Sequence, residues 1–240
     1  MSKGETALNK SLPEQQLTPK TNRYLWFISL FVLIQLVQIP IILFRYIGIK
    51  DTPLKIANSV LYVGAFAAVI WLAIFLLHRL PGQHYFAKLN SHQWAVTGLG
   101  LVAFFAVEIV LGLLNAKLTG QNQTANNDTL RQLMGADSWS LYLMAFSGIF
   151  LSPILEETVF RGYLMNAFFK PNAFWLPVII SGLLFSVAHG STTIISFLIY
   201  AGMGWVLAFT YRKVGSLWAS ISIHMLNNLI AMTALLISIK

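Results

Sequence analysis

The sequence predicts an all-α, polytopic membrane protein with about seven transmembrane helices, and three observations support this fold class. Of the 240 residues, 57% are hydrophobic and only 10% are charged, whereas about 25% of the residues of soluble domains are charged. The hydrophobic residues form runs close to the roughly 20 residues that a helix needs to cross a bilayer core. The absence of cysteine excludes a disulfide scaffold, a thiolate metal site and a cysteine nucleophile. The composition also excludes a soluble enzyme and a nucleic-acid-binding protein, although the net charge is +8.

The predicted helices follow a polar N-terminal stretch. No hydrophobic run starts near Met1, so we expect residues 1–23 to be a flexible cytoplasmic tail and not a cleaved signal peptide. Each of the seven hydrophobic runs is a candidate transmembrane helix: residues 24–44, 56–77, 94–114, 139–155, 174–189, 192–211 and 217–237. The fourth run can continue as helix to about Phe169, which would give a length of roughly 46 Å with a kink at Pro153.

The basic residues predict the orientation in the membrane. With the N-terminus inside, ten of the sixteen lysine and arginine residues lie on the inner side, which is the bias typical of cytoplasmic loops. The longest loop, residues 115–138, then faces outward, and its Asn, Gln and Thr content predicts a solvated connector. Because the loops are short and no organellar signal is present, we expect a multi-pass protein of a bacterial plasma membrane.

Three of the eight acidic residues lie in or beside hydrophobic runs, namely Glu108, Glu156 and Glu157. An ionisable group inside a bilayer costs on the order of 2.5 kcal/mol or more and usually marks function. On a helix, Glu157 and Arg161 are four residues apart and can form an ion pair. Glu156 points about 100° away from that pair. One carboxylate is therefore left without a cationic partner.

Two further polar clusters occur in the C-terminal half, one at His189 and one that contains His224 and Asn228, which share a helix face. Counted along the predicted helices, Glu156, His189 and His224 lie about 20, 24 and 15 Å from turns on the same side of the membrane. This agreement in depth predicts one buried site. Packing of helices by polar side chains is the alternative explanation for the asparagines.

Such a site favours hydrolysis by activated water. A desolvated glutamate can act as a general base toward water, and a neighbouring imidazole can orient that water or protonate a leaving amine. The second imidazole and an asparagine can supply hydrogen bonds to a developing oxyanion. The chain offers no Ser–His–acid arrangement and no intramembrane aspartate pair, because every aspartate lies in a polar segment. The expected substrate is a membrane-embedded or lipidated peptide.

The polar clusters form three motifs in order: Glu156-Glu157-x-x-x-Arg161, Phe185-x-x-x-His189 and His224-x-x-x-Asn228. In these residues the chain resembles the CPBP intramembrane proteases, a family that includes CAAX-processing, bacteriocin-processing and Abi proteins. The resemblance covers residues 139–237, which implies a catalytic four-helix core in residues 139–240. Residues 24–138 would then hold the N-terminal transmembrane helices and the polar loop.

The resemblance also implies roles for these residues. Glu156 would be the water-activating base and His189 its catalytic partner, while His224 and Asn228 would line the oxyanion side. Three residues would support them: Glu157 and Arg161 as a structural pair, and Phe185 as the ring that packs beneath His189.

For this family a metalloprotease mechanism and a glutamate–water mechanism without metal are competing views. We expect no cofactor, because an adjacent glutamate pair with Arg161 is not a standard set of metal ligands. The alternative is a zinc ion held by Glu156, His189 and His224. The implied partners are the lipid bilayer and a membrane-associated or lipidated peptide, in CAAX-type or in bacteriocin- and pheromone-type processing. No nucleic-acid partner is expected.

Two other functions are compatible with the same residues. A non-catalytic family member would act as a bacteriocin immunity factor or a membrane scaffold, but loss of Glu156 or of a histidine would be expected there, and all are present. A proton-coupled transporter would also carry intramembrane Glu and His. It would more often show repeats in both halves of the chain. Glu108 lies outside the motifs, and three roles are open for it: pairing with a basic group, remaining protonated, or contributing to substrate access.

Overall fold

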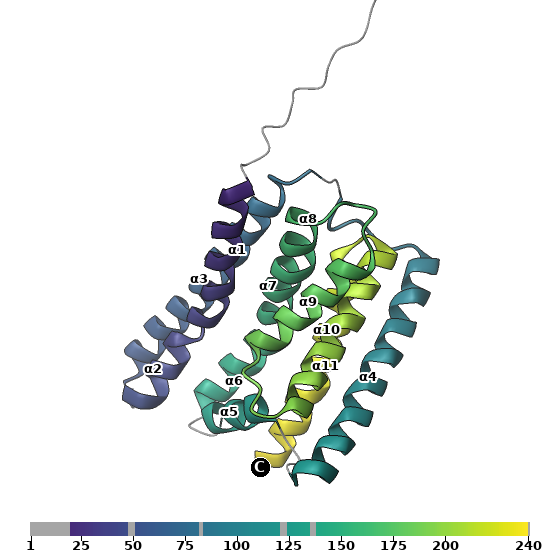
Figure 1. Cartoon of the computed structure of the whole chain (residues 1–240). Coiled ribbons are helices and arrows are strands. Elements are labelled where there is room, and N and C mark those ends of the chain that lie inside the picture. The colour runs from purple at the N-terminus through teal and green to yellow at the C-terminus, as the bar shows by residue number, and fades with distance from the viewer. Residues whose placement is uncertain (1–19, 48–50, 82–83, 121–123, 135–137, 240) are drawn as a thin grey trace, which may run out of the picture.

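A computed structural model describes residues 20–47, 51–81, 84–120, 124–134 and 138–239. These residues are helical with short connections and contain no strand, which confirms the all-α fold class (Figure 1). The elements are α1 (Lys20–Leu36), α2 (Ile39–Ile47), α3 (Thr52–Leu77), α4 (Ser91–Thr119), α5 (Ala125–Met134), α6 (Ser138–Phe146), η1 (Ser147–Leu151), α7 (Ser152–Glu157), η2 (Thr158–Leu164), α8 (Met165–Ala167), α9 (Trp175–Ala188), α10 (Ile194–Val214) and α11 (Leu217–Ile239). The predicted tail lies outside the described residues up to residue 19.

The described residues contain six helices that are long and apolar enough to cross a membrane. They are Asn22–Leu43, Thr52–Leu77, Ser91–Thr119, Trp139–Ala167, Ile194–Val214 and Leu217–Ile237. The remaining predicted span corresponds to α9, a shorter apolar helix of 14 residues. The protein is therefore a multi-pass membrane protein with about seven apolar helices, as predicted.

The fourth span is longer than the run 139–155 and continues to Ala167 as α6, η1, α7, η2 and α8. The segments η1 and η2 are π-helical. Pro153 lacks a backbone N–H, and its ring would clash with a carbonyl of the preceding α-helical turn. The wider π-helical turn of η1 just before Pro153 accommodates that ring within a continuous helix.

The C-terminal helices form the centre of the molecule. Helix α10 packs against α9, α4 and α11, whereas α1 and α3 contact η2 from the other side. In Figure 1, α4 lies at one edge of the bundle, and α1, α2 and α3 lie at the opposite edge. The fourth span lies between α3 and α11 and contacts both, which places its two adjacent glutamates in the middle of the protein.

The loop predicted as a solvated connector has a different structure, and the prediction is corrected here. Helix α4 continues through Thr119, and residues 125–134 form α5. The Thr124 hydroxyl accepts a hydrogen bond from the Asn127 backbone N–H, which caps the first turn of α5. Leu130 and Leu133 then pack toward the protein core. This short helix is therefore part of the folded protein.

Helices α9 and α10 approach closely at two glycines. A Cβ atom on Gly204 would lie 2.8 Å from the Gly182 Cα and 3.2 Å from its carbonyl oxygen. Neither atom can move without displacing a helix backbone. Small residues allow such close approach between membrane helices.

We expect Gly204→Ala to lower the Tm of the protein in detergent micelles by about 2–10 °C, since overpacking costs about 1–3 kcal/mol. Thermal unfolding followed by circular dichroism measures the change. Gly98→Ala is the matched control, because a Cβ at Gly98 meets no atom within 4 Å. Equal Tm values for the two variants would contradict the close packing of α9 and α10.

Candidate active site

The two adjacent glutamates lie at the end of α7 and have different surroundings. Glu157 is fully buried, and its Oε1 accepts a hydrogen bond of 2.9 Å from Nη1 of Arg161, one turn later in η2. The same oxygen lies 3.0 Å from Nδ1 of His224 on α11. Because a carboxylate can only accept, this Nδ1 carries the proton. Glu157 thus joins the fourth span to the last helix.

Arg161 is also fully buried and holds three helices together. Its second terminal nitrogen donates to the Gly204 carbonyl of α10 at 2.9 Å. Its guanidinium lies over the Phe185 ring of α9, with Cζ 4.5 Å from the ring centroid. The sequence predicted the Glu157–Arg161 pair, but the contacts of this pair with α10 and α11 were not foreseen. These contacts align the helices that carry the other polar residues.

His189 follows the last residue of α9 and is held between two aromatic rings. Its ring centroid lies 4.3 Å from that of Phe185 on one side. On the other side, the Tyr200 ring of α10 stacks on it at 4.5 Å with an interplanar angle of 21°. Nδ1 lies 2.7 Å from the Phe185 carbonyl oxygen and must be the donor there. In the neutral ring, Nε2 is therefore an acceptor.

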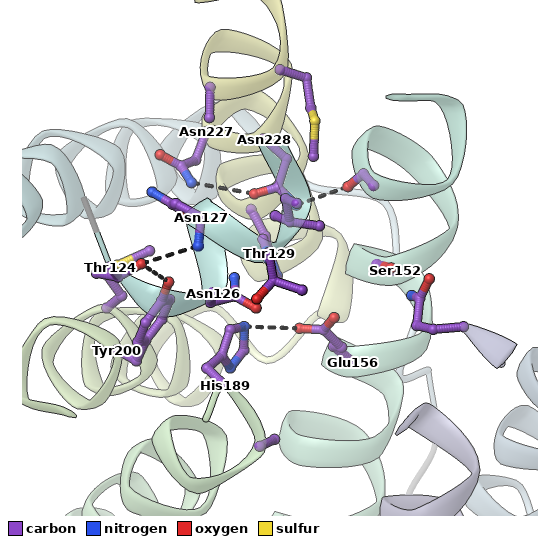
Figure 2. A pocket seen from close by; sticks show the side chains of 18 of the residues that line it. Thr124, Asn126, Asn127, Thr129, Ser152, Glu156, His189, Tyr200, Asn227 and Asn228 are labelled. Atoms are coloured by element: carbon purple, nitrogen blue, oxygen red, sulfur yellow. Dashed lines mark hydrogen bonds and ion pairs between the residues drawn. The ribbon is translucent and has the colours of Figure 1, made fainter. Parts of the chain in front are cut away.

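Glu156 faces His189 across a short gap (Figure 2). Its Oε2 lies 3.9 Å from Nε2 of His189, which is too long for a direct hydrogen bond. This oxygen is buried and has no hydrogen-bond partner among the described residues. The side chains of Glu156 and His189 are 14% and 16% exposed, so both reach an open space. The side chains of Glu157 and Arg161, in contrast, are fully buried.

That space is a cavity of about 560 Å³ between the first half of the fourth span, up to Glu156, and its neighbours. Its lining includes Glu156, His189, His224, Asn227 and Asn228. Three helices that the motifs do not cover also contribute to it: α1 through Gln35, α4 through Glu108 and Asn115, and α5 through Asn126, Asn127 and Thr129. Gln38, in the turn between α1 and α2, lines it as well. The structure thus brings all of the predicted cavity-facing groups to one place.

Asn228 donates a hydrogen bond to a backbone carbonyl of the fourth span that has no backbone donor in the π-helical register. In η1 the Ser152 N–H donates to the Ser147 carbonyl, five residues earlier. The next bond in that register would come from residue 153, which is proline and has no N–H. The Asn228 amide donates to the Gly148 carbonyl at 2.8 Å instead. Its own carbonyl oxygen accepts from Asn227 at 3.3 Å, and one amide hydrogen is left for the cavity.

Two residues of the site were missed by sequence reasoning. Tyr200 supports His189, and its hydroxyl is hydrogen-bonded to the Thr124 hydroxyl at 2.7 Å. A tyrosine in an apolar helix and a threonine in a polar loop carry no local signal that they meet. The stacking of Tyr200 on His189 connects α5 to the centre of the site.

A zinc site would need Glu156, His189 and His224 to converge on one point. Within the described ranges, no three His, Cys, Asp or Glu side chains lie close enough together to hold a metal ion. His224 directs Nδ1 to Glu157 instead. The donor set of the described residues does not fit the zinc alternative.

Residues 138–230 match the family described as "Type II CAAX prenyl endopeptidase Rce1-like". Over these residues the chain is similar to the Rce1-like CAAX protease family. The match covers the part of the chain that carries the three motifs, and it confirms the family resemblance. These proteins are membrane peptidases, and the multi-pass fold agrees with that class.

Curated relatives extend the similarity beyond the matched region. The chain is 27% identical over 217 residues to "Putative membrane peptidase YdiL" of Bacillus subtilis, with 85% of each chain covered. It is 24% identical over 212 residues to "UPF0177 protein YvdC" of Lactococcus lactis, with 72% of this chain and 80% of that protein covered. It is 32% identical over 142 residues to "Membrane-embedded CAAX protease MroQ" of Staphylococcus aureus, with 56% of this chain and 54% of that protein covered. No solved structure matches the chain.

Proposed function

We propose that the protein is an intramembrane endopeptidase in which Glu156 activates a water molecule for attack on a peptide bond. The observation that carries this proposal is the pairing of Glu156 and His189 in the cavity. Their facing atoms are 3.9 Å apart, and Glu156 Oε2 has no hydrogen-bond partner within the described residues. A separation of this size suits two groups that share one water molecule.

Both groups can accept a hydrogen bond from that water. Glu156 accepts as a carboxylate, and neutral His189 accepts at Nε2 because Nδ1 is bonded to the Phe185 carbonyl. As the water oxygen attacks the carbonyl carbon of the substrate, Glu156 takes one water proton. The C–N bond then breaks, and the protonated Glu156 or His189 delivers that proton to the leaving amine.

The negative charge on the substrate oxygen needs hydrogen-bond donors. We assign the amide hydrogen of Asn228 that is not used by Gly148 to this role, since the side chain lines the cavity. His224 uses Nδ1 for Glu157 and retains Nε2, which donates when the ring is protonated. Glu157 and Arg161 act through His224 and Phe185, so they position the site without contacting the substrate.

The proposed substrate is a membrane-associated or lipidated peptide, in CAAX-type or in bacteriocin- and pheromone-type processing. The proposed location is a bacterial plasma membrane with the N-terminus in the cytoplasm, and the relatives named above come from bacteria. Helix α5 lies at one end of the bundle (Figure 1), and residues of α5 line the cavity. With this orientation, that end is the outer one.

A comparison of peptides from two strains tests the proposed activity. Cells that express the wild type or Glu156→Ala are compared by mass spectrometry of their membrane and secreted peptides. We expect one or more peptide termini to occur with the wild type and to be absent with the variant. Asp128→Asn, on the exposed side of α5, is the control for loss of an acidic group. Identical peptides from all strains would favour the non-catalytic immunity or scaffold function.

A further inference from the structure

Glu108 lies in the same cavity as Glu156 but has no part in the proposed reaction. It belongs to α4, where Glu108, Gly112 and Asn115 line the cavity. Their spacing of four and then three residues places them on one helix face. An acidic residue near the middle of a membrane-spanning helix is costly unless it has a function. Its exposure to this cavity indicates where that function is exerted.

Among the described residues that line the cavity, no lysine or arginine is present to neutralise Glu108. Among its described lining residues, the ionisable side chains of acids and bases are Glu108, Glu156, His189 and His224. The ion pairs of the described residues join Glu157 to Arg161, His224 to Glu157 and His189 to Glu156, so Glu108 is in none of them. Arg161 is sealed in the protein and bonded to Glu157 and Gly204. The cavity therefore has a carboxylate without a cationic partner from the described protein.

Tyr200 relates Glu108 to the site of hydrolysis. Glu108, Tyr200 and Glu156 all line the cavity. The Tyr200 ring stacks on His189. Glu108 and the Glu156–His189 pair therefore open into the same space. An extended peptide advances about 3.3–3.6 Å per residue, so a side chain a few positions from the cleaved bond can reach Glu108.

The remaining lining combines apolar side chains, such as Ile34 and Ile199, with amide groups that suit a peptide segment. Asn126 and Asn127 of α5 line the same cavity as Glu108, and Gln35 of α1 and Gln38 of the following turn add further amide groups. Amide groups both donate and accept hydrogen bonds, which matches the alternating groups of a peptide backbone.

We infer that Glu108 forms a subsite for a cationic nitrogen of the peptide substrate, either a lysine or arginine side chain or a free amino terminus. This inference rests on the proposed peptidase function and names the substrate class. A cation in this cavity would form a charge-assisted hydrogen bond with Glu108, which is stronger than a bond between neutral groups. Glu108 would then select the substrate position without taking part in bond cleavage.

Binding and cleavage of one peptide set test this subsite separately from the chemistry. The probes are acetylated twelve-residue peptides of Ala, Leu and Ser in which one lysine moves along the sequence. Each has a partner with norleucine in place of lysine, and one version has a free amino terminus. Binding is measured by fluorescence anisotropy with Glu156→Gln protein in detergent micelles. Cleavage by the wild type is measured by mass spectrometry.

We expect lysine at one position to strengthen binding at least tenfold over norleucine. Glu108→Gln, combined with Glu156→Gln, should abolish this preference, and Glu108→Lys should favour a glutamate at the same position. The combination with Asp128→Asn should keep the lysine preference, because Asp128 is exposed and does not line the cavity. A gain only for the free amino terminus identifies that group as the cation.

Equal binding of lysine and norleucine peptides, or no binding of either, would overturn the subsite. So would a lysine preference that persists in Glu108→Gln. The proposed hydrolysis fails in a different way, when wild type and Glu156→Gln cleave the peptides equally or when neither cleaves them. In that event the anisotropy comparison still decides whether Glu108 binds a cation.

Discussion

Purified Glu156→Gln protein is expected to cleave peptides with a kcat about a thousandfold below that of the wild type. A positioned general base contributes about 10²–10⁴ to the rate, and an amide cannot take the proton of water. Glutamine has nearly the same size as glutamate, and Glu156 has no ion pair as close as the 2.9 Å pair of Glu157. We therefore expect the variant to insert and fold with the Tm of the wild type. Discontinuous assays in detergent micelles, together with thermal unfolding, measure both properties.

Asp128→Asn is the control for this experiment, since it removes the same charge from an exposed position on α5. It should keep kcat within about twofold. A Glu156→Gln enzyme that retains more than a tenth of the wild-type kcat would contradict the role of Glu156 as the base.

Removal of metal ions from the purified wild-type protein separates the glutamate mechanism from the zinc alternative. We expect the wild-type activity to persist after metal ions are removed by a chelator. Activity that disappears and returns on addition of zinc would contradict the glutamate mechanism.

The two adjacent glutamates illustrate what could be predicted from the sequence. A spacing of four residues predicted the pair of Glu157 and Arg161, because this distance along a helix is a local property. The bond between Glu157 and His224 joins residues 67 positions apart. The residue spacing within α7 or within α11 does not predict how the two helices are rotated relative to each other. The agreement in depth predicted that His224 lies at the same level of the membrane as the glutamates. The structure then shows that its hydrogen-bond partner is Glu157 and not Glu156.

The helical structure of α5 and the contact of Tyr200 with His189 could not be predicted from local sequence patterns. Residues 125–134 are rich in Asn and Gln and lack a long apolar face, so the composition favoured a loop. The helix is stabilised by the cap from Thr124 and by packing of Leu130 and Leu133. Tyr200 lies in an apolar helix, where an aromatic residue is ordinarily part of the core. Its contact with His189 depends on how α10 packs against α9, which is a tertiary feature.

Glu157→Met is expected to destabilise the protein by about 3–5 kcal/mol, because it leaves the Arg161 charge buried without its carboxylate. Arg161 has no exposure to solvent, so it cannot regain hydration without opening the contacts among η2, α9 and α10. Arg161→Met leaves the buried carboxylate of Glu157 without its arginine partner and should destabilise to a similar degree. Denaturant or thermal unfolding in micelles, with the yield of monodisperse protein, measures the loss.

The double variant Glu157→Met with Arg161→Met should recover most of the lost stability. Replacing both members of a buried ion pair by apolar residues is often neutral, and a methionine sulfur can pack against the Phe185 ring in place of the guanidinium. We therefore expect a coupling energy of at least about 2 kcal/mol in the double-mutant cycle. Losses that simply add would mean that the two charges do not depend on each other. The double variant should still lose activity, since His224 would no longer be held by Glu157 at the cavity. A stable but inactive double variant would thus separate the folding role of this pair from its role in positioning His224.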